Sequence, residues 1–162
     1  MTLVVLDTSF LLPFLGIRVK DVNHRVLERI EELIVERREM RLCYHELMLP
    51  ELIAKAFSTS IKRGLEEVPR EVIEGFLNIA SGIFIEVLAT TREDLSIAYA
   101  LRLAGHSDFF DCIAYAAAKA RGGVLLTLDR NLKESVKKAG LDTGVIIGQE
   151  EFLALTKPGS SR

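Results

Sequence analysis

The stretch Val4-Val5-Leu6-Asp7-Thr8-Ser9 decides the fold expected for this chain of 162 residues. Its β-branched and apolar residues predict a short buried strand over residues 3–7, which ends on a carboxylate followed by two small hydroxyl residues. Asp is a common helix N-cap, so Asp7 could simply begin the short helix or turn expected over residues 10–15. The other interpretation is that Asp7 belongs to a site formed where several strands end.

Strand and helix patterns alternate along the rest of the chain. The sequence predicts helices over residues 22–38, 48–57, 69–80, 91–105, 108–120 and 131–138, and a last turn over residues 150–155. Short apolar runs predict further strands over residues 41–44, 83–88, 124–127 and 144–147. The segment 58–64 is expected to be a polar, basic joint between two helices. This alternation predicts a three-layer α/β fold, in which helices cover both faces of a mainly parallel five-stranded sheet.

The composition fits one domain of ordinary size. Hydrophobic residues make up 49% of the chain, which indicates a large core, so we expect a single domain over residues 1–156 and a flexible tail over residues 157–162. No apolar run reaches the ~20 residues that a membrane-spanning helix needs, and no signal peptide is recognisable, so a cytoplasmic protein without a membrane span is expected. Cys43 and Cys112 lack metal-ligand spacing and are expected to be reduced core residues. The net charge of -2 does not by itself indicate nucleic-acid binding.

Acidic residues recur where the predicted strands and helices begin or end. Asp7 follows the first strand, and Asp129 follows the fourth. In an open parallel sheet the ligand site lies beyond the carboxyl ends of the strands, where the strand order reverses. If the order is 3-2-1-4-5, Asp7 and Asp129 face each other across one crevice. Glu51, on the helix after the second strand, and Asp111, on the helix before the fourth, can reach the same place.

Each of the remaining acids has a simpler interpretation beside the functional one. Asp108 lies three residues before Asp111, and it can cap the same helix instead of serving a site. Glu51 can form an i,i+4 pair with Lys55, worth only about 0.2 to 0.5 kcal/mol. Glu46 competes with Glu51 as the acid of this segment, and Glu51 is preferred because it precedes a clear helical stripe.

Several carboxylates in one crevice require protons or cations. Two like charges ~4 Å apart repel by about 4 kcal/mol at an effective dielectric constant near 20. Oxygen ligands without His or Cys favour Mg²⁺ or Mn²⁺, and such ions suit phosphodiester cleavage. The hydroxyls of Thr127 and Ser9 could hold a carboxylate or a water in this site, or serve as turn and cap residues.

In their order and spacing, four segments resemble a PIN domain. These segments cover residues 4–11, 49–52, 111–118 and 125–129. The resemblance implies a Rossmann-like sheet of order 3-2-1-4-5 and a Mg²⁺- or Mn²⁺-dependent ribonuclease. Its four acids would fall on Asp7, Glu51, Asp111 and Asp129, and the hydroxyl before the last acid on Thr127. The chain is most similar to the toxins of VapBC-type toxin-antitoxin pairs, which cut RNA until a small partner protein blocks the site.

The resemblance leaves the role of Asp108 and the RNA contacts open. Lys62, Arg63, Arg130 and Lys133 could contact phosphates, or they could belong to ordinary solvated segments. The implied partners are an RNA substrate and a small antitoxin protein. A homodimer is also conceivable, because the chain has apolar helices to spare.

Three other classes of protein were weighed against this interpretation. A haloacid dehalogenase-type phosphatase needs a second Asp two residues after the first, where this chain has Ser9. A receiver domain needs an acid pair after the first strand and a Lys after the fifth, where this chain has Thr8-Ser9 and Gly148-Gln149. The serious alternative is a PIN-like module that binds RNA or protein without cutting, although such a module has no reason to keep four mutually repelling acids.

Overall fold

A parallel five-stranded sheet forms the centre of the computed structural model, which describes residues 1–36 and 40–157. Its strands are β1 (Thr2–Leu6), β2 (Met40–His45), β3 (Glu86–Leu88), β4 (Val124–Leu126) and β5 (Ile146–Ile147). They are ordered β3-β2-β1-β4-β5, and every neighbouring pair is parallel. The predicted fold class and strand order are therefore confirmed.

Strand β1 occupies the middle of the sheet and determines where its carboxyl edge opens. It pairs with β2 on one side and with β4 on the other, where Leu6 is in register with Leu126. Val4, Val5 and Leu6 are fully buried, because helices cover both faces of the sheet. The strand ends at Leu6, one residue earlier than predicted, and Asp7 begins the next helix. The order reverses between β1 and β4, so the carboxyl ends of these two strands define the switch point.

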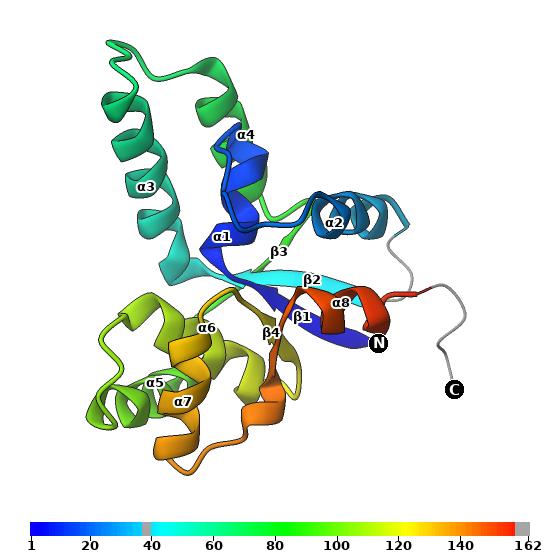
Figure 1. Cartoon of the computed structure of the whole chain (residues 1–162), viewed down its shortest axis with the longest axis vertical. Coiled ribbons are helices and arrows are strands. Elements are labelled where there is room, and N and C mark those ends of the chain that lie inside the picture. Colours follow the sequence, from blue (N-terminus) through cyan, green and yellow to red (C-terminus); the bar gives the residue numbers. More distant parts are fainter. Residues whose placement is uncertain (37–39, 158–162) are drawn as a thin grey trace.

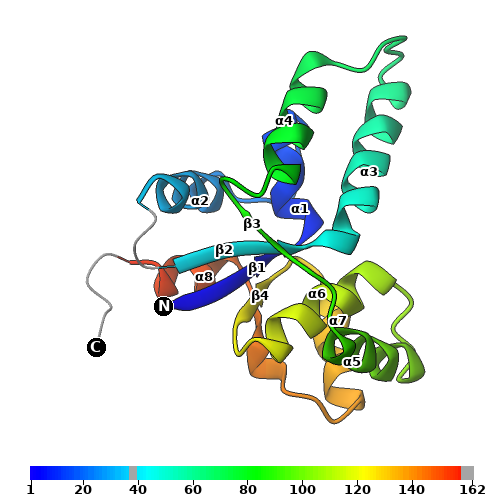
Figure 2. The same cartoon turned by 180° about the vertical axis from the view of Figure 1, so that it is seen from behind.

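Helices form a layer on each side of the sheet (Figures 1 and 2). One layer contains α1 (Thr8–Leu11), a 3₁₀ turn (Leu12–Leu15), α2 (His24–Glu36), α3 (Leu49–Lys62) and α4 (Arg70–Ala80). The other contains α5 (Arg92–Leu103), α6 (Phe109–Ala120) and α7 (Arg130–Lys138), and the last helix, α8 (Gln149–Leu155), packs against α2. Every residue of α6 from Cys112 to Ala118 is buried, which accounts for its almost wholly apolar sequence.

Helix α3 is longer than the sequence predicts. The prediction of a polar connection over residues 58–64 is wrong, because the helix continues to Lys62. The hydroxyls of Thr59 and Ser60 donate to the carbonyls of Lys55 and Ala56, so these polar residues are satisfied inside the helix. Helices α3 and α4 consequently form a hairpin that projects away from the sheet (Figure 1).

Strand β3 is shorter than predicted. It begins at Glu86 rather than at residue 83. Gly82 adopts a positive φ of 68°, and the backbone N–H of Ile83 donates to the hydroxyl of Ser81, so the residues after α4 form a turn before the strand.

A single hydrophobic cluster joins the sheet to both layers of helices. Cys43 and Cys112 are buried in it as free thiols, as predicted. Among the described residues, no helix combines the length and the apolar composition needed to cross a membrane. Residues 37–39 and 158–162, which include the predicted end of the second helix and most of the predicted tail, lie outside the described part of the chain.

Candidate metal and catalytic centre

Two acids meet at the switch point, joined by one hydroxyl. Asp7 follows β1, and Asp129 follows β4 and caps α7. The hydroxyl of Thr127 donates to Oδ2 of Asp7 at 3.0 Å and accepts from the backbone N–H of Asp129 at 3.0 Å. Thr127 thus fixes the orientation of one acid and the backbone position of the other, as expected for a hydroxyl in this position.

Asp7 is a buried carboxyl without a full counter-charge. Its side chain also accepts from the backbone N–H of Thr8 at 2.6 Å, so it caps α1 as well as facing the crevice. Burial raises the pKa of Asp7 to about 6, and the negative charge of Glu51 adds to the rise, although the bond from Thr127 opposes it.

Glu51 lies beside Asp7, in the first turn of α3. One of its carboxylate oxygens accepts from the hydroxyl of Thr8 at 2.6 Å, and the other forms an ion pair with Lys55. The sequence placed a supporting hydroxyl at Ser9, but Ser9 is half-buried in α1 and Thr8 makes the contact. Lys55 therefore brings a positive charge to this side of the crevice, and this charge also acts on Asp7.

Two further candidate acids have structural partners. Glu46 accepts from the backbone N–H and the hydroxyl of Thr90, at 2.7 and 2.6 Å, so the geometry favours Glu51 as the acid of this segment. Asp108 caps α6 by accepting from the backbone N–H groups of Phe110 (2.8 Å) and Asp111 (3.3 Å). Its charge nevertheless contributes to the field at Asp111.

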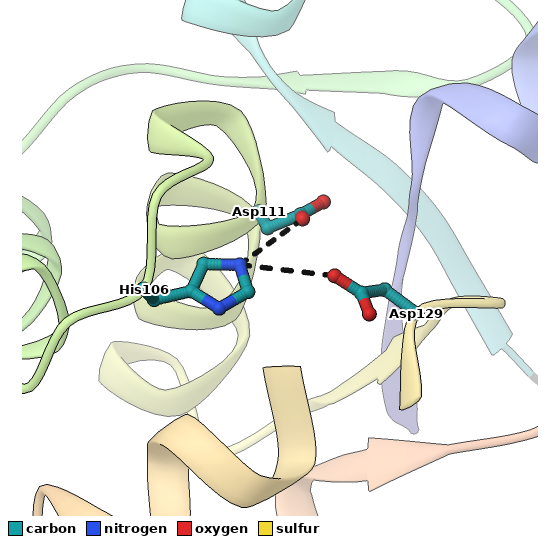
Figure 3. A group of neighbouring side chains, drawn as sticks. All are labelled: His106, Asp111 and Asp129. Carbon is teal, nitrogen blue, oxygen red and sulfur yellow. Dashed lines mark hydrogen bonds and ion pairs between the residues drawn. The ribbon is translucent and has the colours of Figure 1, made fainter. Parts of the chain in front are cut away.

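Asp111 lies in the first turn of α6 and faces Asp129 across the crevice (Figure 3). Burial raises the pKa of Asp111 to about 9, and its hydrogen bond with Asp129 and the charges of Asp7 and Asp108 add to this rise. In the absence of a cation, Asp111 therefore holds a proton at neutral pH. The four acids that the sequence singled out do converge at the end of β1 and β4.

His106 is a member of this cluster that the sequence analysis missed. It is 7% exposed, and its Nε2 lies 3.2 Å from Oδ2 of Asp111 and 3.7 Å from Oδ2 of Asp129 (Figure 3). Its Nδ1 lies 3.0 Å from the hydroxyl of Ser135 on α7. One ligand atom from each of His106, Asp111 and Asp129 fits within a mutual distance of 4.8 Å. The predicted ligand set contained no His, and the signal in the sequence for this neighbour was a histidine five residues before Asp111.

The basic residues proposed as RNA contacts lie in two different places. Lys62 and Arg63 are at the far end of α3, roughly 16 Å along the helix from Glu51, so the structure does not bring them to the acids. Arg130 and Lys133 are exposed on α7 and line a groove of about 540 Å³ that begins at Asp129. The groove continues to the start of α8, and its other lining residues are Asp21, Thr127, Leu128, Ile146, Gly148, Gln149 and Glu151.

This donor set fits a divalent cation. Two carboxyl groups and an imidazole converge from the end of β4 and from the segment at the start of α6, and the charge of Asp7 acts on Asp111. Burial and neighbouring negative charges raise the pKa values of Asp7 and Asp111, to about 6 and about 9. A divalent ion bound here would offset the repulsion between the acids, since carboxylate oxygens are the ligands that Mg²⁺ and Mn²⁺ prefer.

The fold and this cluster define a class: a Rossmann-like α/β domain with acids at its switch point. Residues 4–138 match the PIN domain family, and the chain belongs to that family. No curated protein matches the sequence.

Solved structures share the fold. PAE2754 from Pyrobaculum aerophilum is similar at 19% identity and a TM-score of 0.60, over 96% of this chain and 89% of that one. VapBC-1 from nontypeable Haemophilus influenzae is similar at 15% identity and a TM-score of 0.60, over 92% and 99%. DNA-bound VapBC from Salmonella typhimurium is similar at 20% identity and a TM-score of 0.56, over 92% and 99%.

Proposed function

We propose that this protein is a Mg²⁺- or Mn²⁺-dependent endoribonuclease. The observation that carries the proposal is the convergence of Asp7, Glu51, Asp111 and Asp129 at the switch point, where burial raises the pKa values of Asp7 and Asp111. Membership of the PIN family supports it. A module that only binds RNA would gain nothing from this uncompensated charge, which destabilises the fold.

The residues of the site have separable roles in this proposal. Asp7, Asp111 and Asp129 would hold the metal, which supplies Lewis acidity toward the phosphodiester and lowers the pKa of an attacking water. Thr127 fixes Asp7 and the backbone of Asp129. Glu51, whose carboxylate contacts Thr8 and Lys55, would accept a proton from water or substrate.

The substrate would approach along α7. The groove that begins at Asp129 has a volume of about 540 Å³, and Arg130 and Lys133 provide positive charge along it. Lys62 and Arg63 could contact only RNA that also runs along α3. We therefore propose Arg130 and Lys133 as the nearer phosphate contacts.

We further propose that the enzyme is the toxin of a toxin-antitoxin pair that acts on cytoplasmic RNA. Two of the similar structures are VapBC proteins, which supports a small protein partner. The α3–α4 hairpin exposes the apolar side chains of Phe57, Ile61, Leu65, Val68, Ile73 and Leu77. Such a surface favours a protein partner, either an antitoxin or a second copy of the chain.

The decisive experiment is cleavage of single-stranded and structured RNAs by wild type and two variants. Asp7→Asn removes a charge from the centre, and Glu46→Gln removes one from an acid held by Thr90 outside it. Wild type and Glu46→Gln should cut with Mn²⁺ and stop with EDTA, whereas Asp7→Asn should lose more than about 100-fold in rate. Binding of RNA without cutting by folded, metal-loaded wild type would favour the non-catalytic module instead.

A further inference from the structure

The donors of the centre are not equivalent. Both carboxylate oxygens of Glu51 already have partners, the hydroxyl of Thr8 and the ammonium group of Lys55. On the other side of the crevice, Nε2 of His106 faces one oxygen from Asp111 and one from Asp129 (Figure 3). The sharpest convergence of ligand atoms in the described chain therefore includes a nitrogen.

We propose that His106 is a metal ligand, and that His106, Asp111 and Asp129 form a mixed nitrogen and oxygen site that prefers Mn²⁺ to Mg²⁺. This inference rests on the proposed metal-dependent function and adds to it the identity of the preferred ion. It also gives a buried histidine outside the four expected acids a defined role.

The distances agree with coordination of one ion. Two ligands that bind the same ion at ~2.1 Å lie roughly 3 to 4 Å apart, depending on the angle between them. Nε2 of His106 lies 3.2 Å from the Asp111 oxygen and 3.7 Å from the Asp129 oxygen. All three ligand atoms lie within 4.8 Å of one another, a spacing that agrees with binding of one ion.

Ser135 provides the second contact that a metal-binding histidine normally has. A ligating imidazole usually donates its other ring N–H to an oxygen, and this bond fixes the ring and the tautomer. Nδ1 of His106 lies 3.0 Å from Oγ of Ser135, on the side of the ring away from the carboxylates. With the proton on Nδ1, the lone pair of Nε2 points between two carboxylate oxygens, where a cation satisfies all three groups.

The chemistry of the donors sets the preference between ions. Mg²⁺ favours oxygen ligands and near-ideal octahedral geometry, whereas Mn²⁺ and the later transition metals accept imidazole. Burial of His106 at 7% exposure also limits the water that Mg²⁺ tends to retain. Mn²⁺ is therefore the divalent ion that this set of one nitrogen and two carboxylates fits best.

Pulsed electron paramagnetic resonance of Mn²⁺ bound to the 162-residue chain tests the assignment directly. A ligating imidazole nitrogen produces ¹⁴N modulation of the spin echo, and this signal requires no variant to fold. His106→Gln is the test variant. His24→Gln is the matched control, because the side chain of His24 is 82% exposed on α2. Competition calorimetry with Mg²⁺ and Mn²⁺ on the same three proteins gives the ratio of affinities.

The assignment predicts ¹⁴N modulation in wild type and His24→Gln and its loss in His106→Gln. The ratio of Mn²⁺ to Mg²⁺ affinity should fall about tenfold or more in His106→Gln, and a smaller fall is expected in Ser135→Ala, which keeps the ring. Bound Mn²⁺ without ¹⁴N modulation in wild type, or an unchanged ratio in a folded His106→Gln, would overturn it. RNA cleavage with Mg²⁺ that Asp7→Asn abolishes would leave the nuclease proposal intact in that case.

Discussion

Asp111 gives the metal-free protein a measurable dependence of stability on pH. In the unfolded chain its carboxyl has the ordinary pKa of 3.8, whereas in the folded protein the pKa is raised to about 9. Between these values the folded state binds a proton that the unfolded state does not. The stability linked to this proton is fully present at low pH, and it is lost as pH rises toward the folded pKa.

The size of this effect follows from linkage. One such proton changes the free energy of unfolding by about 1 kcal/mol per pH unit. The range from about pH 7.0 to 8.5 lies above the pKa of Asp7, which is about 6, and above the ordinary pKa range of histidine. Asp111 therefore dominates the change of stability with pH in this range. We therefore expect the metal-free protein to lose about 1 to 2 kcal/mol across this window. Asp111→Asn, which cannot titrate, should lose much less.

Urea denaturation at constant ionic strength, with EDTA present, measures these free energies at several pH values. Glu46→Gln is the matched control, because it removes an acid outside the centre and should follow wild type. Parallel curves for wild type and Asp111→Asn would refute the argument that Asp111 holds a proton in the folded state. Saturating Mn²⁺ should also reverse the slope for wild type, since the metal competes with the proton.

Three further predictions concern the rest of the fold. Arg121→Ala should lower the free energy of unfolding in urea by about 3 kcal/mol or more, since it removes the guanidinium that pairs with the fully buried carboxylate of Asp94. Gly75→Ala should lower the melting temperature, at a cost of about 1 to 3 kcal/mol, because the added Cβ would lie 2.2 Å from the carbonyl oxygen of Phe14. Burial lowers the pKa of His45. The stability that this residue contributes is therefore present above pH 6.5 and is lost as pH falls. Urea denaturation between pH 7 and 5 should show a shallower decline in the free energy of unfolding for His45→Asn than for wild type.

The sequence predicts the sheet and its acids because both depend on local patterns. The apolar run of β1 and the carboxylate at its end are contiguous in the chain, and strand order follows from alternation of strands and helices. Asp7, Asp111 and Asp129 each lie next to the end of an element, so the topology alone brings them to one edge. Glu51 could be predicted from its position in the first turn of a helix that has a clear apolar stripe.

What the sequence could not predict depends on side-chain contacts between distant segments. His106 lies between α5 and α6 with no periodic neighbours, and its partners Asp129 and Ser135 come from a different part of the chain. The choice of Thr8 over Ser9 depends on which hydroxyl faces α3. The extension of α3 through Thr59 and Ser60 relies on bonds back to the helix that composition does not reveal.

A second group of buried charges shows that the unbalanced centre is not a general property of this fold. Asp94 is fully buried, yet both of its oxygens accept from the guanidinium of Arg121, at 2.7 and 3.1 Å, and Thr91 donates to it as well. These bonds outweigh the cost of burial and lower the pKa of Asp94. The same chain therefore compensates one buried carboxylate completely but leaves Asp7 and Asp111 to compete for protons. Because burial without such bonds destabilises the metal-free protein, this contrast supports the proposal that Asp7 and Asp111 belong to a metal site.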